Sequence, residues 1–494
     1  MLVALADSVH NQDALARAPL AGWLMLGAAL GLAAVLFAHR EGFRRLVLRA
    51  EDPRTMGAFR IAFGLCALCN INGMWELFEY LFTDEGLFPT EVARQLVASE
   101  QFAGFGNGLG DDPWGFFDRD AVLTWAAGPR YSPLFFWDSP RFFWCYLAAF
   151  EVAMVCTIAG IGTRWSKWIA WFLFHGIIQR NHVFWEGTEN VYRTFFFYLC
   201  LSRCDRAYSI DNWLRCRRLR RAGRLGEAPV HRLIPAWPRL LVILQCAAIY
   251  CSTGAVKNGR VWWQGDAFYY AFNLDHFYRV PPQPLAAVLG TTLFRLNTHV
   301  VHAWETLFPV VVIAMLIRFG LRERIAISVR DRWISRAGWL ALGGFALALV
   351  LWLYPVHYVA PPRGPWSLLR VQLLFAALWL AGMIIVARGY PRLRDRPRVV
   401  VLRGRSYVLD LDWLLRWCFG RRLWVGLGVV FHLHLVGLMN IGWFSPGCLT
   451  GFICFLHGHE LAVLLAEVRR LAARIGLPVS TEPPAAAEDP AAWA

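Results

Sequence analysis

The chain has 494 residues, of which 57% are hydrophobic and only 17% are charged. This composition is too apolar for an ordinary soluble protein, and stretches long enough to cross a bilayer recur along it. The formal net charge of +15 would suggest a nucleic-acid partner in a soluble chain. Here the arginines cluster between the apolar stretches, which indicates topology signals and contacts with anionic lipids. We therefore predict an all-α polytopic integral membrane protein whose partner is the lipid bilayer, and no nucleic acid.

About eleven transmembrane helices are expected. They cover residues 19–38, 56–78, 141–161, 165–179, 191–201, 237–256, 298–317, 337–354, 368–386, 423–443 and 448–465. Basic segments follow every odd-numbered helix, whereas the alternate segments are acidic or poor in Lys and Arg. Because basic loops stay on the cytoplasmic side, this pattern predicts the N-terminus outside and the C-terminus inside. The expected location is the bacterial inner membrane.

Three regions are expected along the chain. Residues 1–49 hold an N-terminal tail and the first transmembrane helix, and residues 50–465 form the main membrane domain. Residues 466–494 have the composition of a largely disordered cytoplasmic tail. An amphipathic helix on the inner face is expected over residues 407–419.

Chemistry is expected first at Lys257. Of the 50 Lys and Arg residues only Lys167 and Lys257 are lysines, so arginine serves almost wherever a general positive charge is needed. Arginine stays protonated in proteins, whereas a desolvated lysine can become a neutral amine. Lys257 directly follows the apolar stretch 237–256, which favours a role as a base. The alternative is an ammonium that extends to the lipid headgroups.

Three further ionisable residues are expected near the same outer side. His302 and Glu305 are three residues apart in one apolar stretch and so share a helix face, and His182 lies in the short turn after the fourth stretch. With Lys257 they are the candidate catalytic residues, around a pocket for a lipid-soluble substrate. The alternative for His302 and Glu305 is a hydrogen bond between two helices.

Polar residues deeper in the expected helices have a structural interpretation. His432 and His434 are predicted to be core histidines with satisfied hydrogen bonds, and Arg60 is predicted to pair with a carbonyl or an acid. The twelve cysteines lie mostly in apolar stretches, where a thiol acts as a small hydrophobic group, and their spacing completes no zinc site. No metal is predicted.

Several short motifs follow one another between residues 50 and 465. They are Phe59-Arg60-Ile61-Ala62-Phe63-Gly64 with Asp84-Glu85-Gly86, Gln179-Arg180-Asn181-His182 leading to Tyr208-Ser209-Ile210-Asp211, Tyr250 with Gly254, Lys257, Trp262 and Gly265, and Phe431-His432 with Asn440-Ile441-Gly442-Trp443-Phe444. In order and spacing they resemble the horizontally transferred transmembrane (HTTM) domain. This is the membrane domain shared with vitamin K-dependent gamma-glutamyl carboxylase.

The resemblance implies a function for Lys257, which falls where the carboxylase has its catalytic base. In that family a lysine amine deprotonates vitamin K hydroquinone, which then reacts with oxygen. The strong base so formed takes a proton from a glutamate γ-carbon, carbon dioxide adds there, and the vitamin leaves as its epoxide. The implied cofactor is therefore reduced vitamin K or menaquinol.

Two features of the carboxylase correspond less directly. Its second functional histidine aligns near residues 188–190, and His182, a few residues earlier, is the candidate counterpart. Its peptide-binding domain follows the membrane domain, whereas this sequence ends soon after the last expected helix. A quinol-linked oxygenase or epoxidase reaction on an unknown outer-face substrate is thus expected before peptide carboxylation. The alternative is a non-enzymatic membrane protein that binds lipid or quinone or assembles with partners.

Overall fold

The computed structural model describes residues 9–98, 123, 131–181, 187–224, 229–257, 259–275, 277–323, 325–348, 351–352, 367–402 and 404–477. These residues are mainly helical and divide into two compact units. The first unit comprises Met1–Val47 and Ile313–Gly420, and the second comprises Leu48–Val312 and Arg421–Ala494. The expected boundary after residue 49 lies close to the first division, but residues 313–420 group with the N-terminal segment and not with the main domain.

The first unit is built on two long helices, α2 (Val9–Ala38) and α17 (Val329–Ala348), which pack along each other. Their backbones come close at a pair of glycines, since a Cβ on Gly338 would lie 2.6 Å from the carbonyl oxygen of Gly31. Small residues of this kind are typical where helices meet in membranes.

The other elements of the first unit are α3 (Arg40–Leu48), most of α16 (Pro309–Glu323), α18 (Leu368–Asp395), the hairpin of β3 (Arg398–Leu402) and β4 (Arg405–Leu409), and α19 (Leu411–Trp417). The helix expected over residues 407–419 is wrong in its first part, because Tyr407 pairs with Val400 in the hairpin. The helix begins only after Asp410, whose Oδ1 accepts the Trp413 N–H at 2.7 Å as an N-cap.

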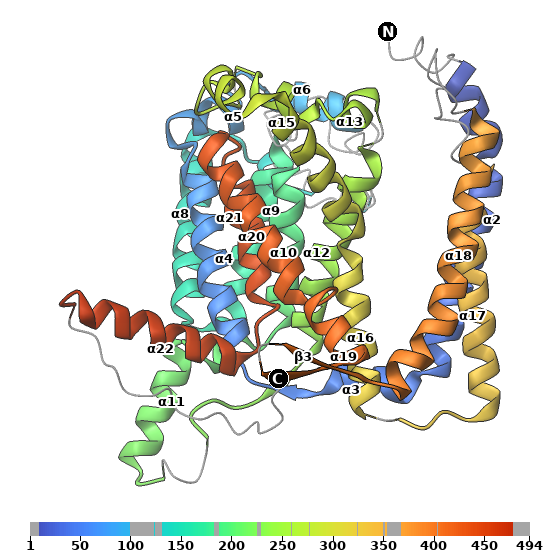
Figure 1. Ribbon diagram of the computed structural model, residues 1–494. Coiled ribbons are helices and arrows are strands. Elements are labelled where there is room, and N and C mark those ends of the chain that lie inside the picture. Colours follow the sequence, from blue (N-terminus) through green and yellow to red (C-terminus); the bar gives the residue numbers. More distant parts are fainter. Residues whose placement is uncertain are drawn as a thin grey trace. The chain divides into compact units, whose positions relative to one another are not determined.

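The second unit is a bundle of helices (Figure 1). Its long members are α4 (Arg54–Asn72), α8 (Pro140–Ala159), α9 (Thr163–Arg180), α10 (Thr188–Leu201), α12 (Trp237–Val256), α15 (Pro282–Leu307), α20 (Arg421–Leu438), α21 (Phe444–Ile453) and α22 (Gly458–Arg474). Shorter elements are η1 (Trp75–Leu77), α5 (Phe78–Phe82), α6 (Thr90–Ala98), η4 (Pro133–Phe135), η5 (Cys204–Arg206), α11 (Ile210–Arg221), α13 (Arg260–Gln264), α14 (Ala267–Phe272) and the paired strands β1 (Ala50–Glu51) and β2 (Ile234–Pro235).

Aromatic side chains fill the middle of this bundle. Phe63 of α4 packs against Tyr192, Phe195 and Phe196 of α10, with ring centroids 5.5–6.3 Å apart. All four side chains are fully buried. A core of this kind gives each aromatic pair a favourable tilted or edge-to-face contact in addition to the burial of its area.

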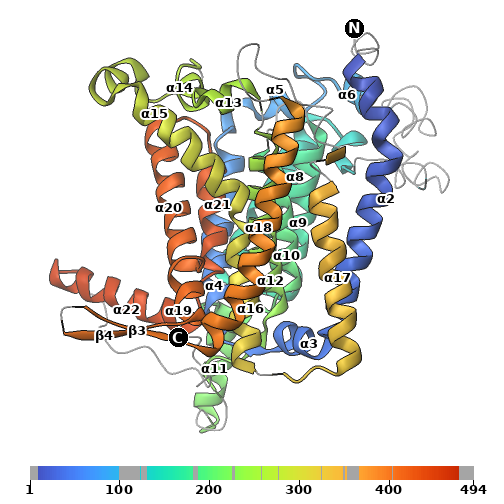
Figure 2. The same ribbon diagram turned by 45° about the vertical axis from the view of Figure 1, so that its right-hand side comes forward.

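The bundle has two chemically different ends. At one end lie α11 and α22 together with the starts of α4 and α12 (Figure 1). We call it the basic end because Arg54 and Arg239 lie in those two starts, Arg421 contacts the Phe455 carbonyl oxygen just before α22, and Arg469 belongs to α22. At the other end α13 and α14 lie beside α15 (Figure 2), and we call it the Lys257 end.

Several helices are long and apolar enough to cross a bilayer, which indicates a membrane protein. Among the described residues, four single helices are long and apolar enough to span the membrane, and the number rises to seven if each bent helix pair is counted as one span. The four are Ala16–Ala38, Pro140–Ala159, Trp237–Val256 and Leu368–Asp395. The predicted helix at residues 237–256 coincides with α12. The number eleven stays a prediction, since helices such as α10, with 14 residues, are short for a full crossing of about 20 residues.

The eleventh expected helix, over residues 448–465, is wrong as a single span. The chain turns by 114° between α21 and α22. The carbonyl groups that lose their helical hydrogen bonds at this turn accept hydrogen bonds from side chains of other elements. Cys454 O accepts from Arg239 Nη1 at 2.8 Å, Phe455 O from Arg421, and Leu456 O from Thr55 Oγ1 at 3.1 Å. Because α22 continues to Arg474, residues 466–474 are helical and not part of a disordered tail.

Candidate active site

Lys257 lies at the end of α12. Its backbone N–H donates to the Gly254 carbonyl oxygen at 3.1 Å, which closes the helix, and its side chain is 22% exposed. The short helix α13 then brings the Trp262 ring against the side chain, with Lys257 Nζ 4.9 Å from the ring centroid. A cation over an indole face is attracted by the ring's quadrupole, so Trp262 helps to position the ammonium.

Glu305 of α15 is the partner of Lys257. Its side chain is only 5% exposed, and its Oε2 accepts a hydrogen bond from Lys257 Nζ in an ion pair. A carboxylate taken out of water requires an opposite charge or hydrogen bonds to compensate it, and the lysine supplies both. The sequence predicted that both residues belong to one site, but not that they contact each other.

His302 lies one helical turn before Glu305 and has a different partner. Its Nε2 donates to the Gly254 carbonyl oxygen at 3.1 Å, and its ring centroid is 5.8 Å from that of Trp262. It therefore borders the same site on the Trp262 side and joins α15 to the end of α12. The alternative expectation for His302, a hydrogen bond between two helices, describes this contact.

Gly254 permits the close crossing of α12 and α15. A Cβ at this position would lie 2.5 Å from the backbone nitrogen of Thr306, which is closer than any side chain can approach. Thr306 follows Glu305 directly, so the glycine allows the carboxylate to reach Lys257. Glycine is needed at position 254 because there is no space for a Cβ, and not because the backbone has an unusual φ angle.

A chain of buried hydrogen bonds lies deeper in the bundle. Tyr250 Oη is 2.7 Å from His432 Nε2, and His432 Nδ1 is 3.0 Å from Ser445 Oγ. The prediction of His432 as a satisfied core histidine is confirmed. Tyr250 precedes Lys257 by seven residues, so the two lie on the same face of α12. This spacing is the sequence signal from which Tyr250 could have been predicted to lie near the site.

The remaining sequence predictions have mixed outcomes. His182 lies outside the described residues, so the structure brings together three of the four candidate catalytic residues. His434 has one satisfied ring atom, since Nδ1 is 3.2 Å from the Val430 carbonyl oxygen while Nε2 has no hydrogen-bond partner in the described part of the chain. The structural role of Arg60 is confirmed, because it donates to the carbonyl oxygens of Cys204 and Tyr208.

Metal ligation has no candidate centre in the described ranges, where no three His, Cys, Asp or Glu side chains gather around one point. No family model, curated protein or solved structure matches the chain. The geometry at Lys257 and the order of the sequence motifs therefore carry the functional argument.

The arrangement can share and transfer a proton. Lys257 Nζ donates a hydrogen bond to Glu305 Oε2, so a proton on the nitrogen already points at the carboxylate oxygen. Lys257 keeps part of its surface exposed while Glu305 is almost fully covered. A ligand can thus approach the lysine side chain. The carboxylate of Glu305 would exchange a proton with that ligand only by way of Lys257.

Proposed function

We propose that this protein is a membrane-embedded enzyme that takes a proton from a lipid-soluble quinol, with the Lys257–Glu305 pair as its acid–base centre. The observation that carries the proposal is the partly buried ion pair at the end of a candidate membrane span, beside an indole ring. Ionisable groups at such positions are costly and are usually retained for function. The resemblance to the HTTM domain supports the same lysine.

The groups around the pair fit a phenolic ligand. Trp262 offers an aromatic face, Lys257 offers a hydrogen-bond donor, and Glu305 offers an acceptor for protons. Reduced vitamin K or menaquinol, when bound, would supply a phenolic proton together with reducing electrons for a reaction with oxygen. Lys257 and Trp262 are the residues we expect to hold it.

Lys257 can act as a base only as a neutral amine. Transfer of one proton from Nζ to the contacting Oε2 of Glu305 produces an amine and a carboxylic acid without changing the charge of the pair. The amine then forms a new N–H bond as the phenolic O–H bond breaks. The pair finishes with a net positive charge opposite the negative charge on the ligand, which stabilises the product of the transfer.

We place the basic end in the cytoplasm and the Lys257 end at the outer side of the bacterial inner membrane, with about eleven spans in all. The arginines at the basic end of the second unit support this orientation. The substrate would then reach Lys257 from the outer leaflet or the outer face.

A non-enzymatic role is the competing proposal. The Lys257–Glu305 pair, the His302 bond to Gly254 and the tight packing of Gly254 on Thr306 together fasten α12 to α15. If this is their whole purpose, the protein binds lipid or quinone, or assembles with partners, without turning a substrate over.

The test compares the purified full-length protein with three variants, Lys257→Ala, Glu305→Gln and Arg295→Gln. Each is incubated with vitamin K hydroquinone or menaquinol, oxygen and bicarbonate, and the epoxide is measured by mass spectrometry. Arg295 is the matched control, because it is on α15 in an exposed ion pair with Asp266 that should contribute little. The Lys257 and Glu305 variants should lose at least about 100-fold in rate, as expected for loss of acid–base catalysis.

Each result has a defined meaning. Turnover by Lys257→Ala equal to that of the unchanged protein would refute Lys257 as the base. If the unchanged protein consumes no quinol, the non-enzymatic role is favoured, and in that case the same variants should lower the midpoint of thermal unfolding without any effect on quinol.

A further inference from the structure

A cavity of about 170 Å³ lies at the basic end of the second unit, and neither Lys257 nor Glu305 lines it. Its walls come from the start of α4, the loop before α11, the segment before β2, and α22. They include Arg54, Tyr208, His231, Leu465, Ala466 and Arg469. Pockets for drug-sized ligands are about 300–1,000 Å³, so this cavity is suited to a group of only a few atoms.

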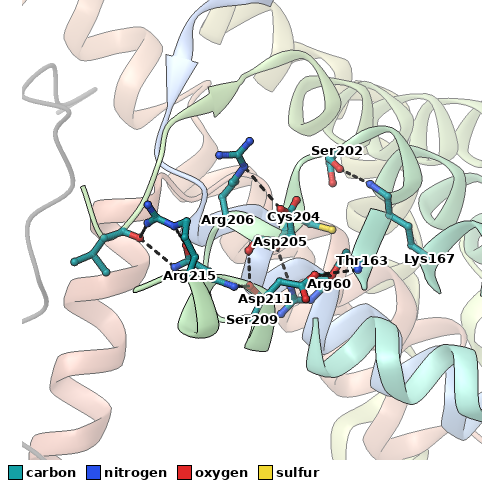
Figure 3. A network of polar contacts seen from close by, with 12 residues as sticks. Arg60, Thr163, Lys167, Ser202, Cys204, Asp205, Arg206, Ser209, Asp211 and Arg215 are labelled. Atoms are coloured by element: carbon teal, nitrogen blue, oxygen red, sulfur yellow. Dashed lines mark hydrogen bonds and ion pairs between the residues drawn. The ribbon is translucent and has the colours of Figure 1, made fainter. Parts of the chain in front are cut away.

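A network of polar contacts fixes the loop that carries Tyr208 (Figure 3). Arg60 donates from Nη1 to the Cys204 carbonyl oxygen at 2.9 Å and from Nη2 to the Tyr208 carbonyl oxygen at 2.5 Å. Asp211 accepts the backbone N–H of Thr163 at 3.0 Å, which ties the same segment to α9. This part of the cavity wall is therefore preorganised.

Tyr208 has an unusual backbone conformation. Its φ is 52°, and among the described residues it is the one non-glycine with a positive φ. A non-glycine residue in this region costs about 1–3 kcal/mol and is held there by its surroundings. The bonds of Arg60 and Asp211 provide such a hold, so the loop keeps the Tyr208 side chain in the cavity wall at an energetic cost.

The cavity has donors and positive charge for an anion. Arg54 Nη2 pairs with Asp52 Oδ2 at 2.5 Å, whereas Arg469 of α22 is exposed and forms no ion pair in the described part of the chain. His231 Nδ1 is buried without a hydrogen-bond partner among the described residues. Burial is the main cause that lowers the pKa of His231, and the charges of Arg54 and Arg215 lower it too, whereas a hydrogen bond with the Arg206 backbone and the charge of Asp52 act in the opposite direction.

We propose that this cavity binds a phosphate group, carried either by an anionic phospholipid headgroup or by a soluble phosphate ester. Arg469 would supply the main charge-assisted hydrogen bond, with a further donor from the Tyr208 hydroxyl. α22 starts below the bundle and extends away from it to one side (Figure 1), and its exposed residues include Leu464, Val468 and Leu471. An amphipathic helix of this kind contacts lipid, so acyl chains would have a surface to lie against beside the cavity.

The test uses the full-length protein in a neutral detergent. Dioleoyl phosphatidylglycerol, dioleoylglycerol and glycerol 3-phosphate are titrated separately, and binding is followed by the thermal midpoint of tryptophan fluorescence and by native mass spectrometry. Arg469→Gln removes the charge in the cavity. Arg474→Gln is the matched control, because Arg474 is an exposed residue at the end of α22 and does not line the cavity. Ala466→Phe fills the cavity and keeps every charge.

The unchanged protein and Arg474→Gln should bind a phosphate-bearing probe equally, with a higher thermal midpoint and one retained molecule. Arg469→Gln should bind about tenfold more weakly, the effect of one charged hydrogen bond, and Ala466→Phe should bind more weakly still. Binding of phosphatidylglycerol alone would identify a lipid, whereas equal binding of glycerol 3-phosphate would identify a soluble ester. If no phosphate compound binds, or if Arg469→Gln and Arg474→Gln behave alike, the proposal is wrong.

Discussion

Each end of the second unit has an ion pair with a covered carboxylate, yet the two cations differ in exposure and in their other partners. At the basic end Arg239 Nε pairs with Glu51 Oε1 at 2.8 Å, and the same guanidinium donates to the Cys454 carbonyl oxygen. At the Lys257 end the ammonium has Glu305 and the face of Trp262. The forked guanidinium joins several groups at once and keeps its proton, whereas the lysine holds one carboxylate and can exchange a proton. At the basic end arginine thus serves as a fastener, whereas Lys257 is placed where a proton can be exchanged. The other lysine, Lys167, is buried and is itself a fastener, since it donates to the Ser202 carbonyl oxygen at 2.6 Å.

The largest expected effect is at the basic end. Arg239→Leu leaves the Glu51 carboxylate buried without its partner and the Cys454 carbonyl without its donor, and should destabilise the protein by about 3–5 kcal/mol. Thermal unfolding in detergent measures this. Arg470→Gln is the control, because Arg470 forms an exposed pair with Glu467 and should change little. Equal midpoints for the two variants would mean that the buried arginine does not hold the end together.

A double substitution sharpens the contrast between the ends. Lys257→Met alone should cost about 1–3 kcal/mol, because the unpaired Glu305 stays buried. Lys257→Met with Glu305→Leu should recover most of this loss, since an apolar pair of similar size replaces a buried ion pair well. At the basic end Arg239→Met with Glu51→Leu should not recover, because the Cys454 carbonyl still lacks its donor. The unfolding midpoints of Lys257→Met, Arg239→Met and the two double variants test this, and recovery of stability at both ends would show that the two pairs do not differ.

A smaller effect is expected at the helix crossing beside Lys257. Gly254→Ala places a Cβ against Thr306 and should cost about 1–3 kcal/mol by overpacking. Gly426 of α20 is the matched control, because no atom lies within 4 Å of a Cβ built there. Gly426→Ala should be stabilising by up to about 1 kcal/mol through helix propensity. Both are read from thermal unfolding, and a stable Gly254→Ala would show that the crossing has room to spare.

The parts of the structure that depend on local pattern were predictable. The apolar stretch before Lys257 gives α12 within the bounds expected, and the three-residue spacing of His302 and Glu305 puts both on the side of α15 that meets α12. The interruption after Leu307 was missed, although Pro309 carries a signal for it, because proline removes a backbone donor and disfavours a helical residue before it.

Features that depend on distant partners could not be predicted. No proline stands between Cys454 and His457, and the turn there depends on side chains from three other elements. The contact of Lys257 with Glu305 depends in the same way on the fit of Gly254 against Thr306. Sequence spacing defines faces within one helix, whereas these contacts depend on which helices become neighbours.

The turn before α22 also has a consequence for the order of assembly. Its carbonyl groups are satisfied by Thr55, Arg239 and Arg421, and all three precede Cys454 in the chain. During synthesis the donors therefore exist before the carbonyls that need them. We expect α21 to dock onto a bundle whose earlier helices already present these donors, because buried backbone carbonyls need hydrogen-bond partners.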